Sequence, residues 1–125
     1  MNKYWMVALG GLLGSVSRFW LGGIISEKMG AKFPYGTFVI NCSGCFLIGL
    51  VMTVLAEKGY ANSMWRYLVV IGFLGGYTTF SSFEYETFHA VQESEFLIGL
   101  LNAVASVVVG FLSVWLGSIA GKTLA

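Results

Sequence analysis

Long stretches almost free of charge constrain this chain more than any other feature of its sequence. They are Tyr4–Ile25, in which Arg18 is the one charged residue, and the uncharged Tyr35–Ala56, Tyr67–Phe83 and Phe96–Gly121. A helix needs about 20 mostly apolar residues to cross the roughly 30 Å hydrocarbon core of a bilayer. Stretches of this length and composition are typical of transmembrane helices.

We therefore predict an all-α membrane protein with four transmembrane helices. The third span continues past its uncharged part into a lightly charged tail, Glu84–Gln92. The four expected spans are residues 4–25, 35–56, 67–92 and 96–121. Only short connections remain between them, so residues 1–125 are expected to form a single transmembrane domain.

The composition excludes the main alternatives to a membrane protein. Charged residues make up 10% of the 125-residue chain and apolar residues 57%, whereas an ordinary soluble domain is about 25% charged. Disordered chains are poor in apolar residues and rich in charge, which is the opposite pattern. A net charge of +1 does not provide the strongly basic surface that nucleic-acid-binding proteins use. The sequence also shows no nucleophile, catalytic base pair or nucleotide loop, so we do not expect an enzyme.

Basic residues are distributed almost evenly between the two expected sides of the membrane. Lys3, Lys58, Arg66 and Lys122 fall on one side, and Lys28, Lys32 and, by its position in the first span, Arg18 fall on the other. This is a weak bias for the rule that basic loops stay in the cytoplasm. Two interpretations remain open: a weakly determined single orientation, or a chain that inserts both ways and pairs with an inverted copy as an antiparallel dual-topology homodimer.

The third span contains a predicted break near Gly75–Thr79. Two adjacent glycines are followed by Tyr77 and two threonines, and each glycine costs a helix about 1 kcal/mol relative to alanine. Irregular backbone at membrane depth survives only where protein buries it or water lines it. The carbonyls freed at a break are potential cation ligands. The alternative is a simple kink in a packed helix.

Polar and aromatic residues beyond the break mark a candidate ion path. Phe80 and Phe83 share one helix face, while Thr79, Ser82 and Glu86 follow on an adjacent face. Ring edges carry partial positive charge and suit weak contact with an anion. An ionisable residue inside a span is a functional candidate by default. The alternatives are core packing for the phenylalanines and a headgroup location for Glu86.

The other spans contribute a few further polar candidates. Asn41 on the second span offers two N–H donors to an anion, or a helix–helix hydrogen bond. Arg18 lies in the last third of the first span and can reach the interface. Small and polar residues form a stripe on the fourth span that fits either helix packing or a hydroxyl-lined path, and its members are Asn102, Ser106, Gly110, Ser113 and Gly117.

Three sequence segments together resemble the Fluc (CrcB) fluoride channel family. They are Gly10-Gly11-Leu12-Leu13-Gly14-Ser15-Val16-Ser17-Arg18-Phe19, Asn41-Cys42-Ser43-Gly44, and Gly72-Phe73-Leu74-Gly75-Gly76-Tyr77-Thr78-Thr79-Phe80-Ser81-Ser82-Phe83. The length, the number of spans and the weak charge bias also fit, and the resemblance covers essentially the whole chain. It implies an antiparallel homodimer with two fluoride pores and a structural sodium ion on the two-fold axis.

The resemblance also assigns roles to individual residues. The sodium ligands would be the backbone carbonyls of Gly75 and Thr78 from both subunits. Phe80 and Phe83 would contact fluoride as an aromatic pair, and Asn41 would donate to it. The remaining assignments are Ser106 in a polar line on the fourth span, Thr79, Ser82 and Glu86 near one pore end, and Arg18 in an anion-attracting vestibule. The sequence departs from a continuous hydroxyl line at Asn102 and Gly110.

The leading hypothesis is a passive fluoride channel in the bacterial plasma (inner) membrane that expels fluoride. Its expected partners are fluoride, a second copy of the chain and the lipid bilayer, with no nucleic acid. A proton-coupled exporter resembling the small multidrug resistance transporters is a second hypothesis, but the first span carries no acidic residue and Glu86 is the only substitute. A non-transporting membrane subunit, whose glycines only pack helices, is a third.

Overall fold

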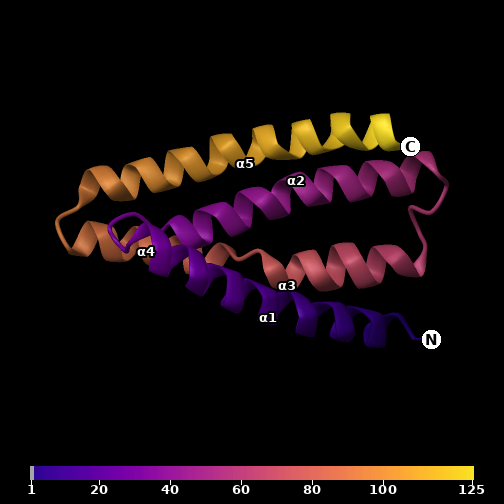
Figure 1. Ribbon diagram of the computed structural model, residues 1–125, viewed down its shortest axis with the longest axis horizontal. Coiled ribbons are helices and arrows are strands. Elements are labelled where there is room, and N and C mark those ends of the chain that lie inside the picture. Colours follow the sequence, from indigo (N-terminus) through magenta and orange to yellow (C-terminus); the bar gives the residue numbers. More distant parts are fainter. Residues whose placement is uncertain (1) are drawn as a thin grey trace.

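The computed structural model describes residues 2–125, and every regular element in that range is a helix (Figure 1). The elements in chain order are α1 (Lys3–Met29), α2 (Tyr35–Glu57), the π-helix η1 (Arg66–Leu74), α3 (Gly75–Tyr77), α4 (Phe80–Gln92) and α5 (Phe96–Leu124). The all-helical class predicted from the sequence is confirmed.

Three of these helices are long and apolar enough to cross a membrane. They are α1, α2 and α5, with 27, 23 and 29 residues. The helix α1 continues to Met29, beyond the expected end of the first span at residue 25, and α5 continues to Leu124 rather than residue 121. Charged side chains such as Glu27 and Lys28 lie in the last turns of α1, because a helix can continue past the hydrocarbon into the polar interface.

The chain between residues 66 and 92 changes its winding twice. It begins as the π-helix η1, passes through the short α3, and resumes as α4. Between α3 and α4, Thr78 and Thr79 have extended backbone angles, with φ −87°, ψ 157° and φ −149°, ψ 125°. Figure 1 shows these segments following one another along the molecule, beside α1 and α2. The π winding of residues 66–74 has no counterpart in the sequence prediction.

The connections lie at the two ends of the helices. Figure 1 places both termini near the connection between α2 and η1, and the other two connections at the opposite end. Glycines take positive φ where two helices stop: Gly30, at φ 86°, ends α1, and Gly59, at φ 79°, follows α2. Pro34 immediately precedes α2, as expected for a residue that begins a helix more easily than it continues one.

Glycines let α1 and η1 meet backbone to backbone. Gly10 and Gly14 are buried on α1. A Cβ atom at Gly10 would overlap the Leu68 carbonyl oxygen, and one at Gly14 would overlap the Phe73 carbonyl oxygen. This approach leaves no room for any side chain. The Gly10/Gly14 pair therefore acts as the close-packing motif that its spacing predicts.

The helices α2 and α5 form a second glycine contact. A Cβ at Gly49 would overlap the Val114 carbonyl oxygen, and one at Gly117 would overlap the Phe46 carbonyl oxygen. Nearby, the hydroxyls of Thr53 and Ser118 share a hydrogen bond of 2.9 Å. Gly117 belongs to the stripe predicted on the fourth span, and at this position the stripe serves helix packing.

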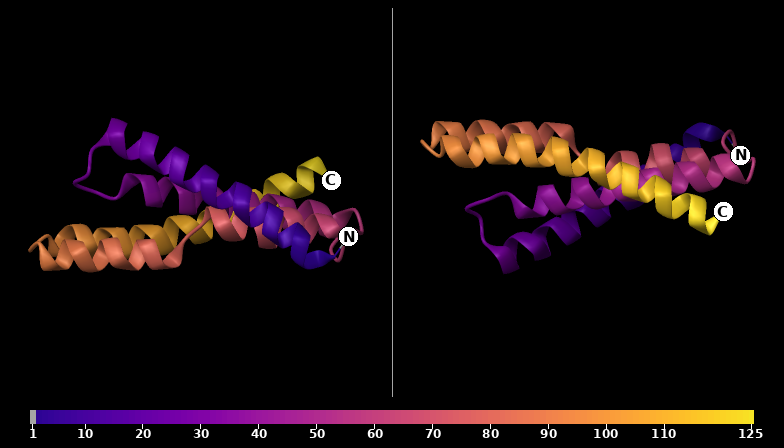
Figure 2. Two further views of the ribbon diagram at one scale, coloured as in Figure 1. Left: turned by 90° about the horizontal axis from the view of Figure 1, so that it is seen from below. Right: turned by 90° about the horizontal axis from the view of Figure 1, so that it is seen from above.

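The buried core is small and lies beside the end of α3. Ile40, Leu74 and Tyr77 form its centre. Most large apolar side chains on α1 and α5 are exposed instead, as suits helices that face lipid. Figure 2 shows the connected ends of α1 and α2 diverging from the connected ends of α4 and α5.

Candidate functional site

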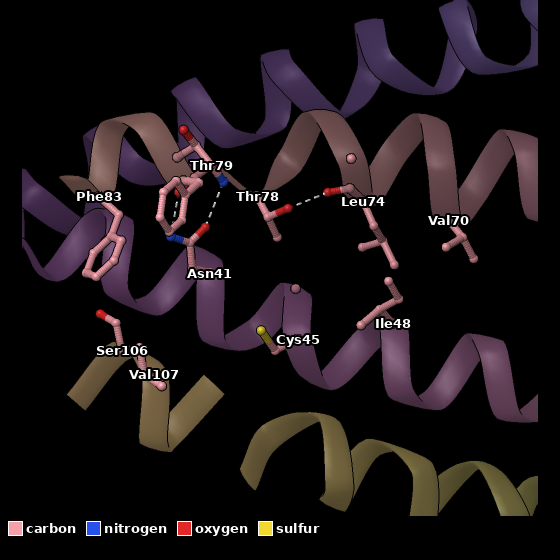
Figure 3. A pocket seen from close by; sticks show the side chains of 13 residues that line it. Asn41, Cys45, Ile48, Val70, Leu74, Thr78, Thr79, Phe83, Ser106 and Val107 are labelled. Atoms are coloured by element: carbon pink, nitrogen blue, oxygen red, sulfur yellow. Dashed lines mark hydrogen bonds between the residues drawn. The ribbon is translucent and has the colours of Figure 1, made fainter. Parts of the chain in front are cut away.

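A cavity of about 380 Å³ lies between α2, α5 and the extended segment that precedes α4 (Figure 3). We call it the break cavity. It brings together most of the residues singled out from the sequence, and those that line it are Asn41, Gly75, Thr78, Thr79, Phe80, Phe83 and Ser106. The side chains of Cys45, Leu74 and Val107 form apolar parts of the cavity wall.

Asn41 binds the extended backbone through both ends of its amide. Its Nδ2 donates to the Thr79 carbonyl at 2.9 Å, and the Thr79 N–H donates to its Oδ1 at 2.8 Å (Figure 3). The side chain thereby supplies hydrogen bonds that a continuous helix would have supplied at this point. One N–H of Nδ2 remains for another acceptor.

The residues after Asn41 hold the preceding part of the same segment. The hydroxyls of Ser43 and Tyr77 share a hydrogen bond of 2.9 Å. A Cβ at Gly44 would overlap Cγ2 of Thr78, so the absence of a side chain there admits the threonine. Three residues of the sequence Asn41-Cys42-Ser43-Gly44 therefore contact the segment Tyr77–Thr79: Asn41 meets Thr79, Ser43 meets Tyr77 and Gly44 meets Thr78. Ser43 and its bond to Tyr77 were not among the candidates from the sequence, because nothing in the pattern pairs them.

The carbonyls near the extended residues have different partners. Arg18 donates its Nε–H to the Gly76 carbonyl at 3.0 Å. The Thr79 N–H, which a continuous helix would direct to the Gly75 carbonyl, is taken by Asn41. No side chain among residues 2–125 donates a hydrogen bond to the carbonyl of Gly75 or Thr78. Gly75 and Thr78, which both line the cavity, thus have carbonyls without a side-chain donor.

The two phenylalanines form an adjacent pair on α4. Their ring centroids are 5.8 Å apart and their planes are inclined by 61°. Phe83 is buried, with 7% of its surface exposed, whereas Phe80 is 74% exposed at the mouth of the break cavity. The sequence prediction that they share one helix face agrees with this placement. The exposed ring of Phe80 requires a neighbour outside the single chain, whether lipid or protein.

Ser106 lies across the cavity from Phe83 (Figure 3). It also belongs to a chain of hydrogen bonds that leads back to α4. Its hydroxyl donates to Oδ1 of Asn102 at 3.3 Å, and Nδ2 of Asn102 donates to Oγ1 of Thr87 at 3.0 Å. Thr87 in turn donates to the Phe83 carbonyl at 2.9 Å. Asn102 is almost completely buried. Thr87 was not a candidate from the sequence, where it is one hydroxyl among many.

Arg18 and Ser82 lie outside the break cavity, in a smaller cavity of about 230 Å³ that Thr79 also lines. Thr37 contributes a further hydroxyl there. Thr79 caps α4, since the Ser82 N–H donates to its Oγ1 at 3.2 Å. Thr79 therefore separates the two cavities and borders both. The guanidinium of Arg18 is held on the backbone at Gly76 rather than extended toward the interface.

Glu86 lies in a third cavity, of about 430 Å³, between the connection after α1 and the end of α4. His89, Glu93 and Lys32 share this cavity with it. Its Oε1 atom is buried without a hydrogen-bond partner among residues 2–125. Thr79 and Ser82 are hydrogen-bonded neighbours. Glu86, one turn further along α4, lines this third cavity, which adjoins that of Ser82 at Ser26.

Comparison with known proteins identifies relatives over nearly the full length of the chain. Residues 5–118 match the family described as CrcB-like protein, Camphor Resistance (CrcB). The chain is 52% identical over 120 residues to a protein of Solibacter usitatus named Fluoride-specific ion channel FluC, covering 96% of this chain and 98% of that one. A protein of Acidobacterium capsulatum with the same name is 48% identical over 122 residues, covering 98% of each chain. The protein therefore belongs to the CrcB-like family.

Proposed function

We propose that this protein is a passive fluoride-specific ion channel, a multi-pass protein of the bacterial plasma (inner) membrane that lowers cytoplasmic fluoride. The break cavity is the observation that carries the proposal: amide, hydroxyl and aromatic groups converge on it in a chain of apolar helices. Relatives that bear the name Fluoride-specific ion channel FluC share up to 52% of its residues. The activity is transport of the ion rather than chemistry on it.

The cavity offers fluoride weak contacts of several kinds. Asn41 retains one N–H beyond the bond that it donates to Thr79. Phe80 and Phe83 present ring edges, which carry partial positive charge. Ser106 adds a hydroxyl on the opposite wall. Conduction requires sites that bind an ion and also release it, and weak contacts satisfy both conditions.

Arg18 and the hydroxyls around it suit the approach to the cavity. Its charge stays within a space that also contains Thr79 and Ser82. A positive charge at such a point raises the local concentration of anions. Thr79 borders this space and the break cavity, so it marks the passage between them. Glu86 would lie on the same side of the break cavity as Arg18, because its cavity and the cavity of Arg18 share Ser26.

We further propose that η1, α3 and α4 together form the third membrane crossing, interrupted at Thr78–Thr79, and that two chains pair in antiparallel orientation. The exposed ring of Phe80 beside the cavity supports pairing, since a pore residue needs protein around it. The small imbalance of basic residues supports insertion in both orientations. Tandem fusions test this directly: two copies joined in antiparallel orientation should conduct, and two joined in parallel should not.

A structural sodium ion between the two chains is the last part of the proposal. Sodium, like other hard cations, prefers oxygen ligands. Gly75 and Thr78 line the break cavity, their carbonyls accept no side-chain hydrogen bond among residues 2–125, and two chains would contribute four such oxygens. The residues present therefore fit the ion, and the ligands would be backbone oxygens rather than side chains.

Anion efflux from liposomes tests the proposed function. Purified protein should release fluoride rapidly and chloride negligibly, with the same rate whether or not a proton gradient is imposed. A rate that depends on the proton gradient and is lost in Glu86→Gln would favour the exporter. Equal fluxes of chloride and fluoride, or no flux of either, would overturn the channel.

A further inference from the structure

We infer that Asn102 is a positioning residue that holds the hydroxyl proton of Ser106 away from the ion path, so that Ser106 binds fluoride only after releasing Asn102. The inference rests on the proposed channel function and concerns the two helices that meet at the break cavity. Its basis is the chain of hydrogen bonds from Ser106 through Asn102 and Thr87 to the backbone of Phe83.

The Phe83 carbonyl, at the end of this chain, determines which group donates in each of its hydrogen bonds. A backbone carbonyl can only accept a hydrogen bond, so Thr87 must donate its single O–H to the carbonyl of Phe83. The Thr87 oxygen can then only accept from Asn102, and the amide must present Nδ2 to it at 3.0 Å. The other end of the amide, Oδ1, therefore faces Ser106. Because Oδ1 has no proton, Ser106 must be the donor in the 3.3 Å bond.

The burial of Asn102 prevents the amide from escaping this arrangement. Only 2% of its surface is exposed, so neither end of the amide can exchange its partner for water. A buried amide keeps the orientation that satisfies both of its ends, because an unsatisfied polar group in this environment is costly. The orientation of Asn102 thus depends on Thr87, which lies on the neighbouring helix.

This arrangement makes Ser106 a poor anion ligand until its hydroxyl turns. With its proton on Asn102, the Ser106 oxygen presents lone pairs to the cavity, and these repel fluoride. At 3.3 Å the bond to Asn102 is longer than the roughly 2.8 Å typical of O–H···O bonds, so it can be broken at small cost. Asn102 therefore competes with fluoride for one proton and weakens the site at Ser106.

Two substitutions should release the Ser106 proton by different routes. Thr87→Val removes the acceptor that orients the amide, with little change in volume, so Asn102 can turn and donate to Ser106 instead. Asn102→Leu removes the competing Oδ1. Each variant should lower the fluoride concentration that gives half-maximal single-channel current in planar bilayers by about fivefold, the factor expected for one hydrogen bond. Thr123→Val is the matched control on the same helix, since the Thr123 hydroxyl is exposed and bonds only to its own helix at Ile119.

The double variants with Ser106→Ala decide the interpretation. If Asn102 acts through the Ser106 hydroxyl, neither Thr87→Val nor Asn102→Leu should shift the half-maximal concentration once that hydroxyl is gone. A shift that persists in the Ser106→Ala background, or unchanged half-maximal concentrations in both single variants, would overturn the inference. A parent protein that carries no fluoride current would instead overturn the proposed function. Thr87→Val alone suffices if Asn102→Leu fails to assemble.

Discussion

Asn41 and Thr79, which are 38 positions apart in the sequence, exchange two hydrogen bonds, of 2.9 and 2.8 Å. A primary amide carries the same donor and acceptor as a peptide group. Asn41 can therefore pair with the N–H and the carbonyl of Thr79, whose backbone is extended rather than helical. The same exchange keeps the Thr79 N–H off the Gly75 carbonyl. One side chain on α2 thereby sets both the path of the backbone and the oxygens that it leaves open.

Asn41→Asp should disrupt this exchange. The new carboxylate could still accept from the Thr79 N–H, but it would oppose the Thr79 carbonyl with a second acceptor and a negative charge. We expect the free energy of unfolding to fall by about 1–3 kcal/mol and fluoride efflux to fall at least tenfold. Thermal unfolding in detergent and liposome efflux measure the two effects. Asn62→Asp, at an exposed position between α2 and η1, is the control, and equal effects of the two substitutions would contradict the assignment.

Arg18→Lys should reduce fluoride efflux about tenfold even though it keeps the charge. The contact to the Gly76 carbonyl is made by Nε of the guanidinium at 3.0 Å, and lysine has no equivalent donor at that point on its chain. The efflux rates of Arg18→Lys and Arg18→Gln at low and high ionic strength distinguish the hydrogen bond to Gly76 from the attraction of anions by the positive charge. Full activity in the lysine variant, together with a salt-sensitive loss in Arg18→Gln, would show that charge alone matters.

Phe80→Ile should abolish most fluoride efflux without weakening the folded chain. The ring is 74% exposed, so its loss removes little buried surface, whereas it lines the break cavity. Efflux and the elution volume of the purified protein are the measurements. The matched control is Phe88→Ile on the same helix, at a residue that is 56% exposed. Wild-type efflux from the Phe80 variant would remove this residue from the ion path.

Gly14→Ala should destabilise the protein, whereas Gly23→Ala should not. A methyl group at Gly14 would overlap the Phe73 carbonyl oxygen, while nothing lies within 4 Å of the same atom at Gly23. Separating α1 from η1 to admit the methyl group costs about 1–3 kcal/mol or more. Thermal unfolding of both variants in detergent tests the difference. Similar melting temperatures would mean that α1 and η1 are not in the contact described above.

Replacing sodium with a bulky organic cation such as N-methylglucamine should slow fluoride efflux in proteoliposomes. The larger ion cannot reach the carbonyls of Gly75 and Thr78, so the proposed ion that joins the two chains would be lost. Adding sodium back should restore the rate with saturation at a concentration that reports its affinity. Efflux that is identical in the two cations during prolonged dialysis would argue against a sodium ion at this position.

The sequence predicted the helices well because a bilayer demands a long apolar stretch from each crossing. The helix α1 runs past the predicted span to include Glu27 and Lys28, because charge is tolerated once the helix leaves the hydrocarbon. The π winding of Arg66–Leu74 was not predictable, since no residue type specifies it. The glycine spacing of Gly10 and Gly14 predicted close contact but could not name η1 as the partner.

The candidate site was predictable as a set of residues and not as a set of contacts. Polar residues are rare in apolar spans, so Asn41 and Ser106 were visible at once. The bond from Arg18 to Gly76 joins residues 58 positions apart, and no pattern in the sequence encodes that separation. Glu86 follows Ser82 by one turn of α4, as the sequence predicts, but nothing in the sequence shows that the two residues line different cavities.

The glycines at the helix contacts have different effects in two stages of folding, the insertion of helices into the membrane and their later packing. In water, helices that contain so many glycines would be marginal, because each glycine weakens the helix. In hydrocarbon an unpaired peptide group is so unfavourable that α1 and α5 become helical on insertion regardless. Glycine therefore has little effect on helix formation during insertion. It acts in the later packing of the helices, when its lack of a side chain lets Gly14 contact Phe73 and Gly117 contact Phe46. The choice of which helices pair is made after insertion, by backbone shape rather than by hydrophobicity.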